Sequence, residues 1–157
     1  MAYLPALFGP ALMLIGERAV YQFMSWLAPD DYKGGLWYFH ERDGQPLFMS
    51  PDADKRFRIF CETNGYTGEV SAEAAGIIAT LFALSHLSFR HEADQLSEAY
   101  MRLYEVAGDH PEAGEIFARL IDKGAAPPVR ELGIDAALAP GAATPAFDVN
   151  LRFPTHV

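Results

Sequence analysis

The chain has 157 residues and a formal net charge of −9, with half of its residues apolar and 13% aromatic. This length and apolar content predict one folded domain with its own core and exclude general disorder. The negative charge disfavours unspecific nucleic-acid binding, which depends on lysine and arginine side chains that displace counterions. A single cysteine excludes an intramolecular disulfide and, with no basic signal region before the first apolar run, we expect a soluble, cytoplasmic protein.

The N-terminal third begins with helical patterns. Residues 4–8 predict a turn or a short helix, and Gly9-Pro10 predicts the start of a longer helix with proline at its first position. Apolar side chains then recur at helical spacing from Leu12 to Leu27. We expect that helix to end at Pro29, before a polar, glycine-containing loop.

The middle of the chain predicts four strands in sequence. Asp43-Gly44 and Asn64-Gly65 are strong signals for tight hairpin turns, because these residues accept positive φ angles. Alternation of Phe57, Ile59 and Cys61 with charged residues favours a strand that has one buried face. We therefore expect a four-stranded antiparallel sheet. Its predicted strands are residues 36–42, 46–50, 56–62 and 66–70.

The stretch after these strands predicts the central helix of the core. Ser71 has the residue type and position of an N-cap, and Glu73 falls in the first turn. From residue 74 to residue 84 only Gly76 and Thr80 interrupt an apolar run. A helix without a polar face is expected to be buried on all sides, and this run is too short to span a bilayer.

Two amphipathic helices and a tail of different composition are predicted for the remainder. The helices cover residues 94–107, with Asp94 as the expected cap, and residues 111–122. Alanine, proline and glycine then dominate residues 124–157, which predicts an irregular or docked tail. The predicted architecture is α+β: a compact domain over residues 1–123, with a four-stranded antiparallel sheet packed against about four helices.

No residue pattern in the chain indicates catalysis, a cofactor or a metal. His40 and Cys61 are the one pair to consider as base and nucleophile, but the pattern around them offers no third orienting group. Cys61 alternates with apolar residues, which favours a small buried side chain. His86 and His91 are five residues apart and would not share a helical face, so a metal site is disfavoured.

An aromatic cluster is one candidate interaction surface. Tyr32, Trp37, Tyr38 and Phe39 lie within eight positions, beside Gly34-Gly35. In a strand Trp37 and Phe39 face one way and Tyr38 the other, so one set is free to be exposed. Exposed aromatic residues often dominate protein interfaces. The alternative is that helices and the tail cover both faces of the strand.

Carboxylates on the last two helices form a second candidate surface. The candidate acidic face consists of Glu98, Glu105, Glu112 and Glu115. Rows of carboxylates can imitate DNA phosphates and occupy a DNA-binding protein. Arg102, Arg119 and Lys123 are interspersed with them, however, and a solvated helical face is the usual explanation of such a pattern.

Four segments resemble the ArdB/KlcA family of antirestriction proteins. They are DYKGGLWYF at residues 31–39, FMSPD at 48–52, NGYTGEVSAEAAGIIATLFAL at 64–84 and HPEAGEIFARLID at 110–122. The resemblance runs in order from about residue 7 to residue 122, and the long third motif is too specific for a chance match. The chain departs from the family pattern after residue 122.

The resemblance implies an α+β protein, carried by plasmids and other mobile elements, that relieves type I restriction of incoming DNA. It supplies no catalytic residues. We expect a non-enzymatic protein that acts through contacts with a host defence protein, either the type I restriction complex or a factor acting on it. The alternative is a hydrolase- or nuclease-like enzyme that uses the region of His40 and Cys61, and the charge disfavours a DNA-binding accessory factor.

Overall fold

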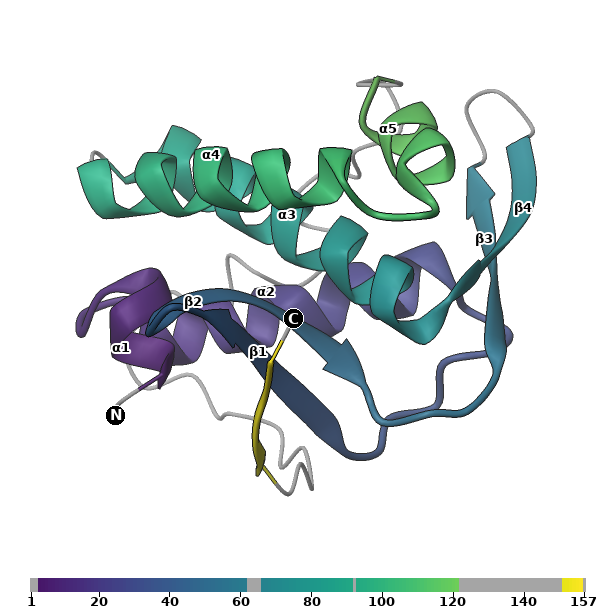
Figure 1. The fold of residues 1–157 in the computed structure, drawn as a ribbon, viewed down its shortest axis with the longest axis horizontal. Helices are drawn as coiled ribbons and strands as arrows, with labels where there is room; N and C mark the ends of the chain where they lie inside the picture. The colour runs from purple at the N-terminus through teal and green to yellow at the C-terminus, as the bar shows by residue number, and fades with distance from the viewer. Residues whose placement is uncertain (1–2, 62–65, 92, 122–150, 157) are drawn as a thin grey trace.

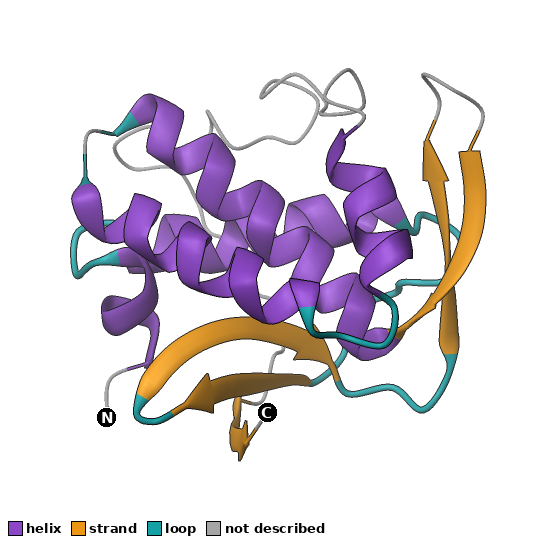
Figure 2. Ribbon diagram, turned by 45° about the horizontal axis from the view of Figure 1, so that its top comes forward, coloured by secondary structure: helices purple, strands orange, loops and turns teal. Residues whose placement is uncertain are grey.

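The computed structural model describes residues 3–61, 66–91, 93–121 and 151–156, and its architecture is α+β, as predicted. In Figures 1 and 2 the helices form a layer over one curved pair of strands, and a second pair stands at one end of that layer. The helices are α1 (Tyr3–Phe8), α2 (Met13–Leu27), α3 (Ala72–Arg90), α4 (Asp94–Gly108) and α5 (Ala113–Ile121). The strands are β1 (Trp37–Arg42), β2 (Gln45–Pro51), β3 (Arg56–Cys61), β4 (Tyr66–Ser71) and β5 (Leu151–His156).

The strands belong to two separate sheets, so the predicted four-stranded sheet is wrong. Each of the four predicted strands exists, but β1 pairs antiparallel with β2, and β3 with β4, without a ladder between β2 and β3. In the tail, β5 pairs parallel with β1 on the side away from β2. The predicted turn between β1 and β2 is confirmed, since Asp43 and Gly44 both have positive φ angles.

Polar side chains from elsewhere in the chain occupy the strand edges that a four-stranded sheet would join. On β2, the Met49 N–H donates to Thr80 Oγ1 of α3 at 3.2 Å instead of to another strand. On β3, the Arg58 N–H donates to Asp31 Oδ2 at 2.8 Å. Because each of these N–H groups already has a side-chain acceptor, neither is available to pair with another strand.

Asp31 is fixed beside β3 by its pairing with Arg58. The guanidinium of Arg58 donates to both carboxylate oxygens, with Nη2 at 2.9 Å from Oδ1 and Nε at 3.1 Å from Oδ2. These side-chain bonds, together with the bond from the Arg58 backbone, hold the pKa of Asp31 below its usual range. The loop that follows α2 is thereby attached to the second sheet.

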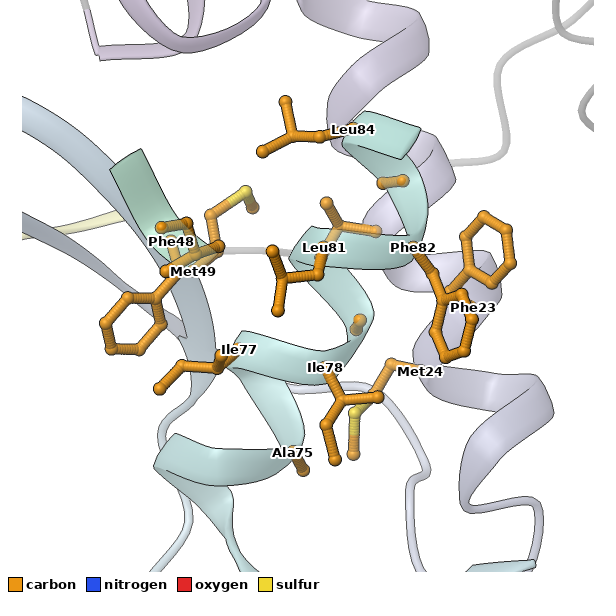
Figure 3. Close-up of a cluster of buried hydrophobic side chains, with 14 of the residues drawn as sticks. Phe23, Met24, Phe48, Met49, Ala75, Ile77, Ile78, Leu81, Phe82 and Leu84 are labelled. Carbon is orange, nitrogen blue, oxygen red and sulfur yellow. The ribbon is translucent and has the colours of Figure 1, made fainter. Parts of the chain in front are cut away.

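Helix α3 is buried nearly all round, as its apolar sequence predicts. Figure 3 shows Ile77 and Leu81 directed toward Phe48 and Met49 of β2, while other side chains of α3 face α2. Gly76 allows the closest contact, because a Cβ atom there would overlap the Met49 carbonyl oxygen and the backbone of Ser50. This glycine therefore sets how closely α3 approaches β2.

Three expectations about the helices need correction. The described residues contain five helices instead of about four, because residues 3–8 form a full short helix. The second helix begins at Met13 instead of Pro10, since Gly9, at φ +89°, follows the end of α1 and its N–H bonds back to the Pro5 carbonyl at 2.9 Å. Asp94 does not cap α4, whose N-cap position is Ala93 without a side-chain bond.

Helix α3 has the predicted N-cap but is longer than the predicted apolar run. The Ser71 N-cap is confirmed, because its hydroxyl oxygen accepts from the Ala74 N–H at 3.1 Å. The helix continues beyond the apolar run to Arg90, and its 19 residues are long and apolar enough to cross a membrane. Two thirds of that span is buried between other elements of the fold, which is typical of a core helix.

Candidate functional site

His40 hydrogen-bonds to a serine of the neighbouring strand, inside the core. The His40 Nε2 atom lies 2.7 Å from Ser50 Oγ, and the imidazole stacks on the Phe48 ring at 4.1 Å between centroids. Only 4% of the His40 surface and 3% of the Ser50 surface are exposed. Burial lowers the pKa of His40 to about 4. The ring is therefore neutral near pH 7 and enclosed by protein.

This pair lacks the features of a catalytic dyad. Within the described residues the second ring nitrogen of His40, Nδ1, has no hydrogen-bond partner, so no carboxylate orients the imidazole. Cys61 belongs to β3 in the second sheet, while His40 belongs to β1 in the first. Its side chain is not among those described. No group of three or more His, Cys, Asp and Glu side chains in the described ranges is arranged to hold a metal ion.

Three of the four aromatic residues proposed for an interaction surface belong to the core. Trp37 is fully buried and donates from its indole Nε1 to Tyr32 Oη at 3.1 Å. Phe39 stacks on Tyr3 at 4.6 Å between ring centroids. Tyr38, on the other face of β1, is half-buried. The cluster therefore packs against neighbouring elements and does not form an open aromatic patch.

Glu112, one of the four predicted acidic residues, connects three elements of the fold. Its carboxylate accepts from the backbone N–H of Ser71 at 3.0 Å and from the Ser71 hydroxyl. Arg56 of β3 adds a contact at 3.2 Å. Burial alone would raise the pKa of Glu112, but the bonds from Ser71 and the charge of Arg56 outweigh it and lower that pKa. Glu112 thus has a structural role at the start of α3.

His110 strengthens the same junction. Its Nδ1 accepts from the Glu112 N–H at 3.0 Å, so Nε2 carries the proton of the neutral ring and donates to Glu73 of α3 at 2.8 Å. The HPE segment at residues 110–112 therefore ties the start of α5 to the start of α3. His110 and Glu112, which lie in the fourth segment that resembles the family, therefore have structural roles in this chain.

Glu98 and Glu105 are different, because they are exposed on an outward face of α4. A turn of 3.6 residues places Asp94, Glu98, Glu105 and Asp109 within roughly 60° of one another around the helix axis. All four are exposed, and none forms an ion pair with another described residue. Glu115, in the first turn of α5, is also exposed but belongs to a separate helix.

Two large apolar side chains lie next to the acidic stripe. Met101 is 57% exposed and Tyr104 is 42% exposed, and around the axis of α4 they lie roughly 20° and 80° from the nearest carboxylate, on the same side of the stripe. The Tyr104 ring contacts Phe117 of α5 at 4.9 Å between centroids. We did not predict these two residues as site residues, although both fall outside the apolar stripe of Leu96 and Leu103 that faces the core.

Arg102 does not interrupt the exposed acidic stripe in the way its sequence position indicates. Its guanidinium Nη2 turns back toward the Pro46 carbonyl of β2 at 3.4 Å, and the residue is half-buried. Arg102 and Arg42 instead line a hollow of about 280 Å³ beside Glu105 and Asp109. Because charges of both signs line the hollow, it favours no single ligand charge.

Six exposed residues form the outer face of α4: Asp94, Glu98, Met101, Tyr104, Glu105 and Asp109. It combines a negative stripe about 22 Å long with two exposed apolar side chains along one side of that stripe. Such a face can attract a positively charged surface and bury apolar atoms against it.

Comparison with known proteins identifies the family. Two antirestriction proteins named KlcA, both from Escherichia coli, are 41% identical over 128 residues and 40% identical over 124 residues. Those alignments cover 78% and 76% of this chain and 86% of each relative. A solved structure is 42% identical with a TM-score of 0.64, covering 73% of this chain and 83% of its own.

That solved structure comes from work on KlcA and ArdB, described as having a novel fold and antirestriction activity against type I DNA restriction systems in vivo but not in vitro. A sequence profile of the antirestriction proteins matches residues 30–122 of this chain, from the loop after α2 to the end of α5. The matched region includes both antiparallel strand pairs, the buried helix α3 and the HPE junction. By its sequence and its fold, this chain belongs to the antirestriction protein family.

Proposed function

We propose that this protein relieves type I restriction of incoming mobile DNA in the bacterial cytoplasm. The observation that carries the proposal is the similarity to KlcA, at 41% identity over most of both chains, together with the shared fold. The KlcA and ArdB proteins are described as active against type I systems in vivo but not in vitro. That difference supports action through a cellular partner, either the restriction complex in its native setting or a factor acting on it.

The protein acts through protein contacts without catalysing a reaction. The enclosure of His40 and Ser50 supports this part of the proposal, because a substrate would have to displace core side chains to reach them. The net charge of −9 argues against direct binding to DNA phosphates. A surface that competes for, or redirects, a host defence protein needs neither a nucleophile nor a cofactor.

Phage plating tests the function directly. The chain is expressed in a host with a type I restriction system, and the plating efficiencies of unmodified and previously modified phage are compared. We expect a rise for unmodified phage only, approaching the value for modified phage. The same host without the restriction system controls for unrelated effects. If unmodified phage plates equally poorly with and without the protein, the proposed function is wrong.

Substitutions at the enclosed pair of His40 and Ser50, and at Cys61, test the absence of catalysis. We expect His40→Gln, Ser50→Ala and Cys61→Ser each to retain the relief of the parent chain, provided that the variants accumulate to equal levels. Thermal unfolding of each purified variant controls for loss of fold. A variant that folds normally but gives no relief would favour the hydrolase- or nuclease-like alternative.

A further inference from the structure

From the geometry of α4 we infer that its outer face is the docking surface for a basic region of a host protein, with Met101 and Tyr104 as apolar anchors. This inference rests on the proposed function and specifies where the contact is made. The partner surface has the chemistry of a DNA-handling protein, in which lysine and arginine side chains are clustered to meet phosphates.

Both apolar anchors are exposed in the folded protein. Met101 and Tyr104 are two of only four large hydrophobic side chains that are strongly exposed in the described chain, and they are the only two of the four on one helix. They lie three residues apart, so they are neighbours on the surface of α4. The other two, Leu14 and Phe89, lie on α2 and at the end of α3.

The fold holds α4 and the Tyr104 side chain in place. Leu96, Ala99, Leu103, Val106 and Ala107 bury the opposite side of α4 in the core. Tyr104 is further supported by its contacts with the rings of Tyr100, at 6.0 Å, and Phe117, at 4.9 Å. A side chain held in place in the free protein loses little conformational freedom on binding, which favours it as an anchor.

The carboxylates of α4 determine the charge of the partner surface. Four carboxylates without a described ion pair run beside the anchors, and although Arg42 and Arg102 line the hollow beside Glu105 and Asp109, the four carboxylates outnumber these two arginines. Their unpaired negative charge attracts a basic surface over a distance of about 8 Å at physiological ionic strength. A neutral partner would lack this electrostatic attraction, and an acidic partner would be repelled.

Paired substitutions separate this face from the rest of the surface. Met101→Ala with Tyr104→Ala removes both anchors, and Leu14→Ala with Phe89→Ala is the matched control that removes the other two exposed hydrophobic side chains. We expect the anchor variant to bind its partner about 30-fold or more weakly and to lose most phage relief. The control variant should keep the relief of the parent chain.

A second pair of variants tests the charges. Glu98→Gln, Glu105→Gln and Asp109→Asn together should reduce relief, but less than loss of the anchors. Neutralisation of the exposed Asp30 and Asp54, which lie in other loops, should leave it unchanged. All variants are first checked for unchanged thermal unfolding. If the parent chain relieves restriction and both α4 variants relieve it equally well, the inference is wrong while the proposed function stands.

Photo-crosslinking inside the restricting cell identifies the occupant. A photoreactive phenylalanine analogue replaces Met101 in one variant and Leu14 in the control, and the crosslinked peptide is identified by mass spectrometry. We expect a crosslink from position 101 to a lysine- and arginine-rich segment of a host protein. A crosslink to a second copy of this chain, to a segment without basic residues, or to nothing would overturn the inference.

Discussion

Helices α3 and α4 are neighbours in the fold but have opposite relations to solvent. Thirteen of the 19 residues of α3 are buried, whereas only five of the 15 residues of α4 are. The motif at residues 64–84, which carries much of the family resemblance, therefore contributes its helical part to the interior. The buried residues of this motif cannot touch a partner, so their similarity reports the fold, and exposed elements such as α4 are the better place to seek a contact surface.

The largest expected effect on stability comes from truncating a buried side chain of α3. Leu81→Ala should lower the free energy of unfolding by about 2–5 kcal/mol, because Leu81 is fully buried against β2 and the change leaves a cavity. Met101→Ala on α4 removes a side chain of similar size from the surface and should change stability by less than about 0.5 kcal/mol. Urea denaturation measures both values. Equal effects of the two substitutions would remove the distinction between the helices.

Local features of this fold could be predicted from sequence because they depend on neighbouring residues. The Asp43-Gly44 turn requires only that these two residues accept positive φ angles. The Ser71 cap requires only a hydroxyl three residues before a free N–H. The buried character of α3 follows from its lack of a polar face. Each of these features was predicted and is present.

The separation of the two sheets could not be predicted in the same way. It depends on the contact of Thr80 with Met49 and on the contact of Asp31 with Arg58. The first two residues are 31 positions apart in the chain, and the second two are 27 positions apart. The candidate site has the same limit. Strand alternation placed Trp37 and Phe39 on one face of β1, but only the packing of Tyr3 and other distant residues shows that this face is covered.

The next largest effect is a dependence of core stability on pH. His40 binds a proton near pH 4 in the folded protein and near pH 6.5 in the unfolded chain, so the unfolded state binds more protons between these values. The contribution of neutral His40 is complete above about pH 6.5 and is lost as the pH falls toward 4. The loss should be on the order of 3 kcal/mol.

A variant without this imidazole isolates its contribution. His40→Gln keeps a polar side chain but cannot titrate, so its stability should fall less steeply than that of the parent chain between pH 6.5 and 4. Chemical denaturation at several pH values gives both curves, and the other four histidines contribute equally to each. Parallel curves would show that His40 does not titrate differently in the folded and unfolded states.

A smaller effect is expected at the start of α3. Ser71→Ala removes the bond to the Ala74 N–H and the hydroxyl bond to Glu112, and should cost about 1–2 kcal/mol of stability. Ser71→Asp provides a useful contrast, because it keeps a capping oxygen but places a second carboxylate beside Glu112. If Ser71→Ala unfolds at the same denaturant concentration as the parent chain, the junction with α5 does not depend on this hydroxyl.

The smallest expected effect lies at the start of α4, where the two helices differ again. The N-cap position of α4 is Ala93, which has no side-chain acceptor for the free N–H groups of the first turn. Its backbone is already extended, with φ −134° and ψ 114°, as a capping residue requires. Ala93→Ser should therefore stabilise the protein by about 0.5–1 kcal/mol.

This gain should leave phage relief unchanged, because position 93 precedes the outer face of α4 and the substitution alters none of its six residues. Ala93→Val is the matched control, since valine, like alanine, is a poor N-cap residue and supplies no side-chain acceptor. Denaturation midpoints and plating efficiencies are measured for both variants. A stabilised Ala93→Ser protein that relieves restriction less well would show that the start of α4 has to loosen for function. In that case a rigid α4 could not be the docking element.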